Sequence, residues 1–326
     1  MLVERSGGEA PLDLYKGHLR TINDGNDEPP YIKASRGFFP ALNDPVGWYI
    51  PTNNYDVEKQ NHWILKIQPF VAGGYEATVI EQDLHELAEL MDKPKKTGKR
   101  EEGERKENDV ISSLQRSKKK IRHLIKSMGC DRMLTLTKRE KDSDNFWNLD
   151  QWAAAWKTFT RLCRKIGIDL NYVVVPEQHK KGNYHLHIAI SGHINLKSII
   201  RFWYISLGGR GNEKGANTPG NVDLSYKRNM SDYERRAKLA KYLSKYVDKQ
   251  LGHVEFNKRR YWPSKHKLPS VIRIVLNSED WMGAFFDTCA HLSLDEKEVI
   301  NAMFQFPEHA GFWFSFDTKM AAEVPF

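Results

Sequence analysis

The segment Tyr184–Ile190, with the sequence YHLHIAI, constrains the fold of this 326-residue chain more than any other. Its alternate residues are apolar, which is the period of a β-strand with one face in a core. His185 and His187 then project together from the other face. An apolar run before it, residues 171–177, is joined to it by the sequence HKKGN, so the two segments are predicted to form a β-hairpin.

Helical and strand patterns surround this hairpin and predict an α+β fold. Apolar residues three and four positions apart indicate helices, whereas short runs of β-branched and apolar residues indicate strands. An antiparallel sheet with helices on its faces is the simplest arrangement of these elements. The predicted helices are 110–128, 149–166, 196–206 and 232–248, and the further strands are 131–137, 221–226 and 270–276.

A charged stretch suggests how the chain is divided into domains. Residues 92–108 contain no large apolar side chain and 12 charged ones, as expected of a linker or a solvated loop. We therefore predict an N-terminal region of open role, a linker, a main domain and a helical C-terminal extension. Their predicted bounds are 1–91, 92–109, 110–277 and 278–326.

Composition points to a protein of a reducing, aqueous compartment. No run of about 18 apolar residues is present to span a membrane, and the N-terminus lacks the apolar core of a secretion signal. Three widely spaced cysteines, Cys130, Cys163 and Cys289, cannot form a disulfide framework. A cytoplasmic location without membrane attachment is the expectation.

The two histidines form a candidate metal site. Paired imidazoles on a rigid strand can bind one divalent cation, and an anionic ligand is expected from the neighbouring strand. Depending on the hairpin register, Glu177 or Gln178 lies opposite His185, and the carboxylate of Glu177 is the better ligand. Such a set suits Mn²⁺ or Mg²⁺. The alternative is that both histidines are ordinary residues of a half-exposed strand.

A second candidate site lies on the predicted helix 232–248. Tyr242 and Tyr246 are four residues apart and share one helical face, and Lys245 and Lys249 each follow a tyrosine by three. A tyrosine hydroxyl can attack a phosphodiester to form a covalent phosphotyrosine, assisted by nearby cations. The alternative is an amphipathic helix whose rings cover the core.

Taken in chain order, three motifs resemble those of the HUH endonucleases, the initiators of rolling-circle replication in single-stranded DNA phages and plasmids. An apolar strand ending in Leu-Thr corresponds to MLTLT at 133–137, and His-apolar-His corresponds to HLH at 185–187. Tyrosine followed by lysine three residues later occurs twice in YLSKYVDK, at 242–249. The paired tyrosines are closer to the phage initiators than to single-tyrosine relatives. The resemblance covers residues 110–277.

The resemblance implies a fold and a set of roles. The fold would be a five-stranded antiparallel sheet flanked by helices, and the reaction would be metal-dependent nicking of an origin to leave a 5′-phosphotyrosine and a free 3′-hydroxyl. The second tyrosine would end replication by strand transfer. The implied metal ligands are His185, His187 and Glu177, the nucleophiles Tyr242 and Tyr246, and the assisting cations Lys245 and Lys249.

Charge predicts DNA as the partner. Residues 227–267 contain 13 Lys and Arg and four Asp and Glu, a local net charge of +9 in a chain whose total is +8. Arg259, Arg260, Tyr261 and Trp262 are the candidate DNA contacts. The sequence contains no GxxxxGK[ST] phosphate loop, so a host helicase, with a host polymerase, is the expected source of unwinding and synthesis.

Three other functions are compatible with the same residues. A transposase or plasmid relaxase would use the same chemistry on another DNA. A basic DNA-binding protein without catalysis would use the charge alone, and a metallohydrolase would use the histidines on a small molecule. If a phage encodes the chain, its compartment is the cytoplasm of the bacterial host.

Overall fold

The computed structural model describes residues 19–21, 48–51, 61–83, 107–139, 146–179, 182–192, 195–248, 259–276, 278–306 and 311–316. The chain divides into two compact units, each with its own sheet and core. The five-stranded unit comprises residues 70–72 and 100–268, and the seven-stranded unit comprises the remainder. Within the described ranges, no helix has the length and apolar character needed to cross a membrane.

The five-stranded unit is built on a fully antiparallel sheet, which confirms the predicted α+β class. Its order is β8-β5-β7-β6-β9, so the histidine strand β7 lies at the centre. The strands are β5 (Arg132–Lys138), β6 (Asn171–Gln178), β7 (Tyr184–Ser191), β8 (Gly220–Ser225) and β9 (Trp262–Pro263).

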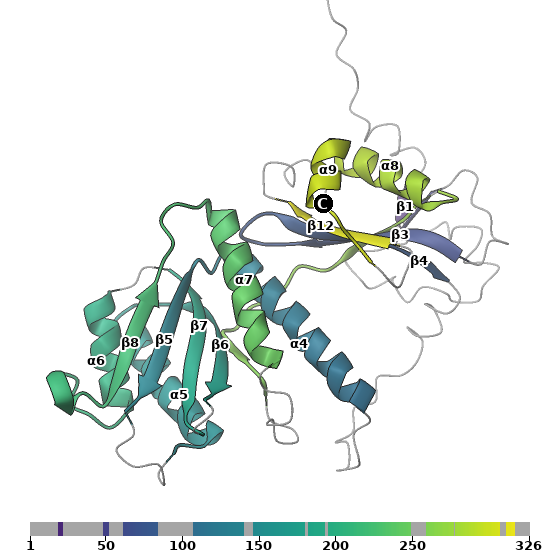
Figure 1. The fold of residues 1–326 in the computed structure, drawn as a ribbon. Coiled ribbons are helices and arrows are strands. Elements are labelled where there is room, and N and C mark those ends of the chain that lie inside the picture. Colours follow the sequence, from purple (N-terminus) through teal and green to yellow (C-terminus); the bar gives the residue numbers. More distant parts are fainter. Residues whose placement is uncertain are drawn as a thin grey trace, which may run out of the picture. The chain divides into compact units, whose positions relative to one another are not determined.

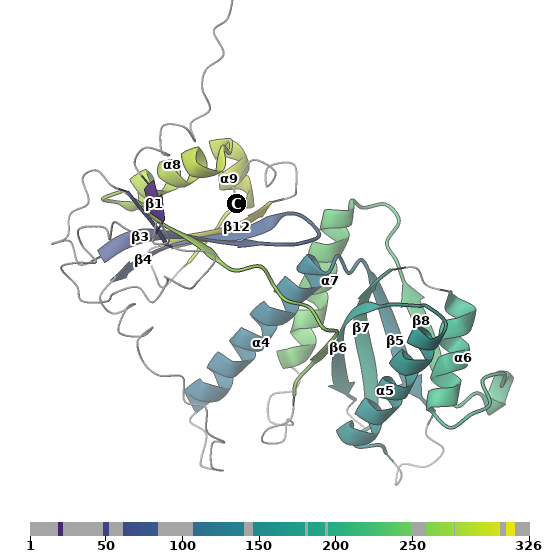
Figure 2. The same ribbon diagram turned by 180° about the vertical axis from the view of Figure 1, so that it is seen from behind.

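Helices cover both faces of this sheet (Figures 1 and 2). Helices α5 (Leu149–Lys165) and α6 (Leu196–Ser206) pack on one face, against the alternate residues of β7 that include Leu186. Helices α4 (Glu107–Ser127) and α7 (Asp232–Asp248) pack on the other, where Ala189 faces them. A short 3₁₀ helix, η3 (Gly215–Asn217), precedes β8. The period-two pattern of β7 therefore separates two cores and leaves its histidines on the α7 side.

Helix α5 follows its sequence pattern closely. The Asn148 side chain accepts a hydrogen bond from the Gln151 backbone N–H, and the Gln151 side chain accepts one from the Asn148 N–H, which forms a capping box. The helix ends before Gly167, whose φ of +76° is in the left-handed region that glycine adopts without strain. Trp152 and Phe159 on its inner face are completely buried.

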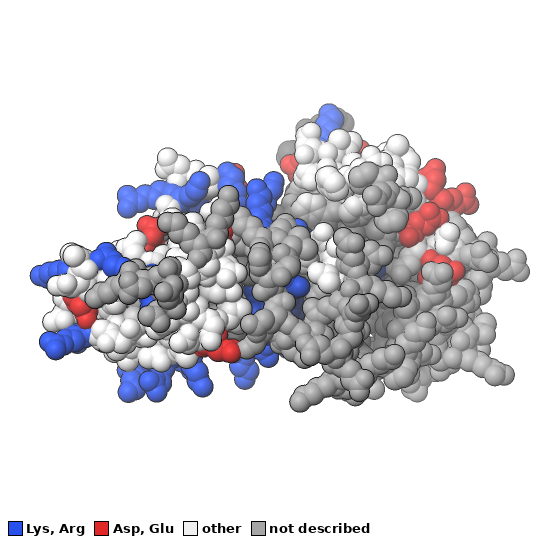
Figure 3. All heavy atoms as spheres, turned by 60° about the horizontal axis from the view of Figure 1, so that its bottom comes forward, with Lys and Arg blue, Asp and Glu red and all other residues white. Residues whose placement is uncertain are grey.

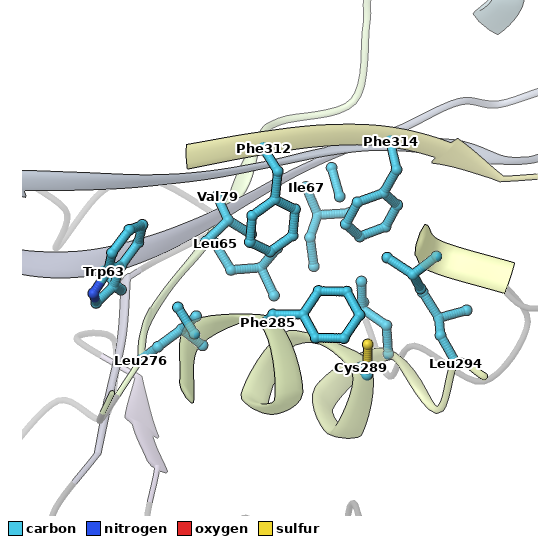
Figure 4. Packing of buried hydrophobic residues seen from close by; sticks show 14 of the residues in the cluster. Trp63, Leu65, Ile67, Val79, Leu276, Phe285, Cys289, Leu294, Phe312 and Phe314 are labelled. Carbon is cyan, nitrogen blue, oxygen red and sulfur yellow. The ribbon is translucent and has the colours of Figure 1, made fainter. Parts of the chain in front are cut away.

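The seven-stranded unit has the order β1-β2-β10-β3-β4-β12-β11. Neighbouring strands are antiparallel except β2 and β10, which are parallel. Phe285 and Cys289 of α8 pack against Phe312 and Phe314 of β12 in its core (Figure 4). The elements are β1 (Leu19–Thr21), β2 (Trp48–Pro51), β3 (Asn61–Pro69), β4 (Tyr75–Asp83), β10 (Ile272–Leu276), α8 (Trp281–Leu292), α9 (Glu296–Ala302), β11 (Phe304–Gln305) and β12 (Gly311–Phe316).

The predicted assignment of strand 270–276 to the main domain is wrong. This strand, β10, pairs with β3, with Ile272 opposite Ile67, and so belongs to the seven-stranded sheet. The fifth strand of the other sheet is the two-residue β9, where Trp262 pairs with Val174. The region after 278 contains β11 and β12 in addition to the expected helices.

Two further predictions fall largely outside the described residues. A helix was expected at 82–91, but β4 extends to Asp83 and the following residues lie outside the described ranges. Most of the predicted linker 92–109 also lies outside them, and its last residues already belong to α4, which begins at Glu107.

Candidate nicking site on strand β7 and helix α7

The hairpin register places Glu177 directly opposite His185 and Val175 opposite His187. Gln178, the alternative ligand, pairs instead with Tyr184, and its side-chain amide donates to the Gly182 carbonyl oxygen at 3.1 Å. Of the two candidates, the carboxylate is therefore the one beside the imidazoles.

His187 is the most enclosed member of this group, with 9% of its side chain exposed. Its Nε2 lies 2.7 Å from Oε2 of Glu177, and its Nδ1 lies 3.5 Å from Oγ1 of Thr135 on the other neighbouring strand. These contacts fix the plane of the ring from both sides. Thr135 belongs to the MLTLT motif, so that motif reaches the histidine directly.

A third imidazole, which the sequence analysis did not include, extends the group. The ring of His179 stacks on that of His185 with centroids 5.8 Å apart, and the His185 and His187 centroids are 6.5 Å apart. His179 follows Glu177 by two residues, so the period-two rule that paired the other histidines could have identified it.

The imidazole of His185 is held in its neutral form. Burial lowers the pKa of His185, and the neighbouring rings of His187 and His179 lower it further, while the charge of Glu177 opposes the shift. A neutral ring has a free lone pair at pH 7, which is the state that a metal ligand requires.

The donor types fit a divalent cation, although they do not surround one point. Two imidazoles and a carboxylate are ligands that Mn²⁺ accepts. Among the residues that the structure describes, no three His, Cys, Asp or Glu side chains are grouped as a ligand set. The direct contact between Glu177 and His187 occupies atoms that a shared cation would use.

Helix α7 positions both tyrosines. Its first turn is capped by Ser231, whose hydroxyl accepts from the Glu234 backbone N–H at 3.2 Å, as the sequence predicted. The rings of Tyr242 and Tyr246 meet edge to face, 5.1 Å apart, and the Tyr246 hydroxyl donates a hydrogen bond to that of Tyr242. The four-residue spacing therefore brings the two phenol oxygens together.

The two phenols differ in their surroundings. Tyr246 is buried and its ring stacks on that of His187, with centroids 4.2 Å apart and planes 14° apart. Burial raises the pKa of Tyr246, and the hydrogen bond to Tyr242 and the charge of Glu177 raise it further. Tyr242 is 45% exposed and is the phenol that a DNA strand reaches from solvent.

The remaining predicted site residues are only partly brought to this place. Lys245 is exposed on α7, whereas Lys249 lies outside the described residues. Arg259 is exposed and Arg260 is half-buried. Trp262 packs at the edge of the core beneath α5 and α6, and Tyr261 at the edge of the core beneath α7. The structure thus gives both rings a packing role as part of the edge strand and its approach.

Comparison with known protein families identifies the same segment. Residues 131–251 match the model of a family described as replication-associated protein ORF2. The match runs from the start of β5 past the end of α7 and covers a little over a third of the chain. This part of the chain is therefore similar to replication-associated proteins. Neither the curated proteins nor the solved structures provide a match.

Proposed function

We propose that this chain initiates rolling-circle DNA replication by nicking and rejoining a single DNA strand through a tyrosine nucleophile. One observation carries the proposal: the Tyr246 ring stacks on His187 and its hydroxyl bonds to that of Tyr242, within the segment that matches replication-associated proteins. Phenols and imidazoles from elements far apart in sequence thus share one small site.

The chemistry follows from the two adjacent hydroxyls. The attacking phenol oxygen bonds to phosphorus and loses its proton, while the bond from phosphorus to the 3′-oxygen breaks and that oxygen gains a proton. The products are a 5′-phosphotyrosine and a 3′-hydroxyl that can prime synthesis. Because the new bond is also a phosphoester, a second phenol can attack the next junction and release the joined strand without a nucleotide cofactor.

His185, His187 and Glu177 are the residues that would hold Mg²⁺ or Mn²⁺. The bound cation would offset negative charge on the scissile phosphate. Its binding would replace the direct contact between Glu177 and His187, and neutral His185 is ready to ligate. The two β7 side chains and the opposite Glu177 come from adjacent strands, so only side-chain torsions separate the described arrangement from a shared site.

Single-stranded DNA at an origin is the proposed partner. The surface of the five-stranded unit visible in Figure 3 is rich in Lys and Arg, with few acidic side chains among them. Lys238 and Lys241 of α7 are both exposed beside the tyrosines. A phosphate backbone near Tyr242 would meet this charge. A host helicase and polymerase would supply unwinding and synthesis.

One observation favours a DNA-binding protein without catalysis as the second candidate. Tyr246 is buried and its raised pKa keeps the phenol protonated at neutral pH, as in a structural tyrosine. The same basic surface would then bind DNA without cutting it. A transposase or relaxase would use the proposed chemistry on a different DNA and is separated by the sequence that is cut.

A covalent adduct is the decisive measurement. Full-length protein is incubated with Mn²⁺ and a random-sequence pool of single-stranded DNA labelled at the 3′ end, because 5′-phosphotyrosine retains the 3′ part on the protein. We expect a labelled band that survives SDS, and no band from the double variant Tyr242→Phe/Tyr246→Phe.

The matched control is Tyr172→Phe, which removes a hydroxyl from a ring that packs on Trp156 at the opposite face of the sheet. This variant should form the adduct as the unmodified protein does. An adduct from the double variant would remove both nucleophile assignments, and DNA binding without any adduct from the unmodified protein would favour the non-catalytic candidate.

A further inference from the structure

A cavity of about 390 Å³ opens beside Tyr242 in the five-stranded unit. It lies between β5, the end of β8 and helix α7, and Met133, Ser225 and Leu239 line it from these three elements. Ligand pockets in proteins range from roughly 300 to 1,000 Å³. The cavity is therefore large enough for a single nucleotide and too small for a longer segment of DNA.

The inner wall of the cavity is apolar. Met133, Met230 and Leu239 line it, and none of the three is fully exposed. Methionine side chains are flexible and polarisable, and they make favourable contacts with aromatic rings. Such a wall suits the flat face of an unpaired base better than it suits a phosphate or a sugar.

A buried cation faces the same space. Arg235 lines the cavity and is only 9% exposed. Its Nη atoms donate to the Lys227 and Met230 carbonyl oxygens and to Asp232. Its Nε has no hydrogen-bond partner among the residues that the structure describes. A buried donor without an acceptor is unfavourable, so this atom indicates a ligand that carries one.

An aromatic platform stands at the rim. Tyr226, between the lining residues Ser225 and Lys227, is 41% exposed. The guanidinium carbons of Arg235 and Arg132 lie 4.8 and 5.3 Å from the centre of its ring. Exposed aromatic rings flanked by cations are the usual platform for unpaired bases and their phosphates.

The cavity and the candidate nucleophiles share one face of α7. Arg235, Leu239, Tyr242 and Tyr246 follow one another at intervals of four, three and four residues, which places them in one row along the helix. Tyr242 belongs to both sets, since it lines the cavity and bonds to the Tyr246 hydroxyl. A strand cut at Tyr242 would therefore place a neighbouring nucleotide at the cavity.

We infer that this cavity binds one unpaired nucleotide next to the scissile phosphate and sets the base preference at that position. The base would lie against the methionines and Leu239, and Arg235 and Lys238 would face its phosphate or an acceptor on the base. The inference rests on the proposed function for its link to the cut, whereas the binding of an unpaired nucleotide can be measured without it.

Asp131 is the group expected to select the base. Its carboxylate lines the cavity and lies 3.5 Å from Nε of Arg132. A carboxylate accepts hydrogen bonds and donates none, so it favours bases that present an N–H group towards it. The substitution Asp131→Asn, which adds a donor at the same place, should change which base is preferred.

The test measures binding without cutting. Full-length protein in EDTA binds fluorescent random-sequence single-stranded DNA, with affinity read from anisotropy and base preference from sequencing the bound fraction. Ser225→Trp fills the mouth of the cavity from an exposed position, so it spares the core. We expect it to weaken binding about tenfold, the scale of one lost base contact, and to abolish the preference at one position. Asp131→Asn should change that preference with little loss of affinity.

Ala154→Trp, an exposed position on α5 at the other face of the sheet, is the control for added bulk and should bind as the unmodified protein does. If Ser225→Trp binds with unchanged affinity and unchanged base preference, the cavity assignment is wrong, whatever the adduct assay shows. If binding depends on the cavity but no adduct forms, the nicking function fails and nucleotide binding stands.

Discussion

The ring of Tyr246 lies nearly parallel to the ring of His187, with their centroids 4.2 Å apart. This stack joins a residue of helix α7 to the central strand of the sheet. It fixes the phenol beside the imidazole group before any DNA is bound, so only the DNA has to be ordered for the proposed reaction.

Each single tyrosine variant should separate cutting from joining. Tyr242→Phe and Tyr246→Phe each leave one hydroxyl, so a covalent adduct can still form, but no second phenol is present to complete strand transfer. We expect joined products to fall to background in both variants. They are counted on a denaturing gel with a labelled acceptor strand, and full joining by either variant would contradict the use of two phenols.

Removal of metal should stop cutting and leave binding. Chelation takes away the cation proposed for His185, His187 and Glu177, whereas the basic surface still attracts phosphates. We expect EDTA to abolish the adduct, Mn²⁺ to restore it, and DNA affinity to depend on salt rather than on metal. Glu177→Gln should raise the Mn²⁺ concentration needed for half-maximal adduct. An adduct that forms equally well in EDTA would refute the metal role.

Adduct formation should persist into mildly acidic solution. An ordinary histidine has a pKa of about 6.5, and burial together with the neighbouring imidazoles lowers the pKa of His185. The ring thus becomes protonated, and loses its lone pair, only as the pH falls below the ordinary histidine value. The adduct yield should be level near pH 6.5 and should decline at lower pH. A decline already complete at pH 6.5 would contradict neutral His185 as a ligand.

Loss of a central tryptophan should unfold the five-stranded unit readily. Trp203 of α6 is completely buried and its Nε1 donates to the Thr137 carbonyl oxygen at 2.9 Å. Trp203→Ala removes a large buried side chain, which lowers the free energy of unfolding by about 3–5 kcal/mol. Urea titration followed by circular dichroism measures this loss, with exposed Lys157→Ala as a control that should change little.

The three cysteines should be protected in the native state. All are buried and free; burial raises the pKa of Cys130 to about 12 and those of Cys163 and Cys289 to about 11. Because the thiolate is the reactive form, little of it exists at pH 8. Mass spectrometry should find no N-ethylmaleimide on the folded protein and three additions in denaturant. Rapid labelling of the folded protein would contradict this burial.

Local patterns predicted the elements better than they predicted the pairing. The periods of 131–137, 184–190 and 232–248 correspond to β5, β7 and α7, because each residue's face follows from its own segment. The strand at 270–276 was correctly expected, but its partner lies about two hundred residues earlier in the chain. Strand β9 is two residues long and contains Pro263, so no period identified it.

The candidate site shows the same division. Spacing alone placed Tyr242 and Tyr246 on one helical face and both histidines on one strand face. It did not show which phenol meets His187, because that depends on how α7 packs on the sheet. The cavity needed three separate elements, and Arg235 became notable only through its burial and its unpartnered Nε.

One rigid helix bears Arg235, Tyr242 and Tyr246, and an α-helix rises about 1.5 Å per residue. The spacing between the inferred base-reading point and the cleavage point is therefore built into the backbone of α7. The helix would act as a fixed ruler: tilting or sliding it would shift both points together, and the cut would stay at the same step from the nucleotide that is read.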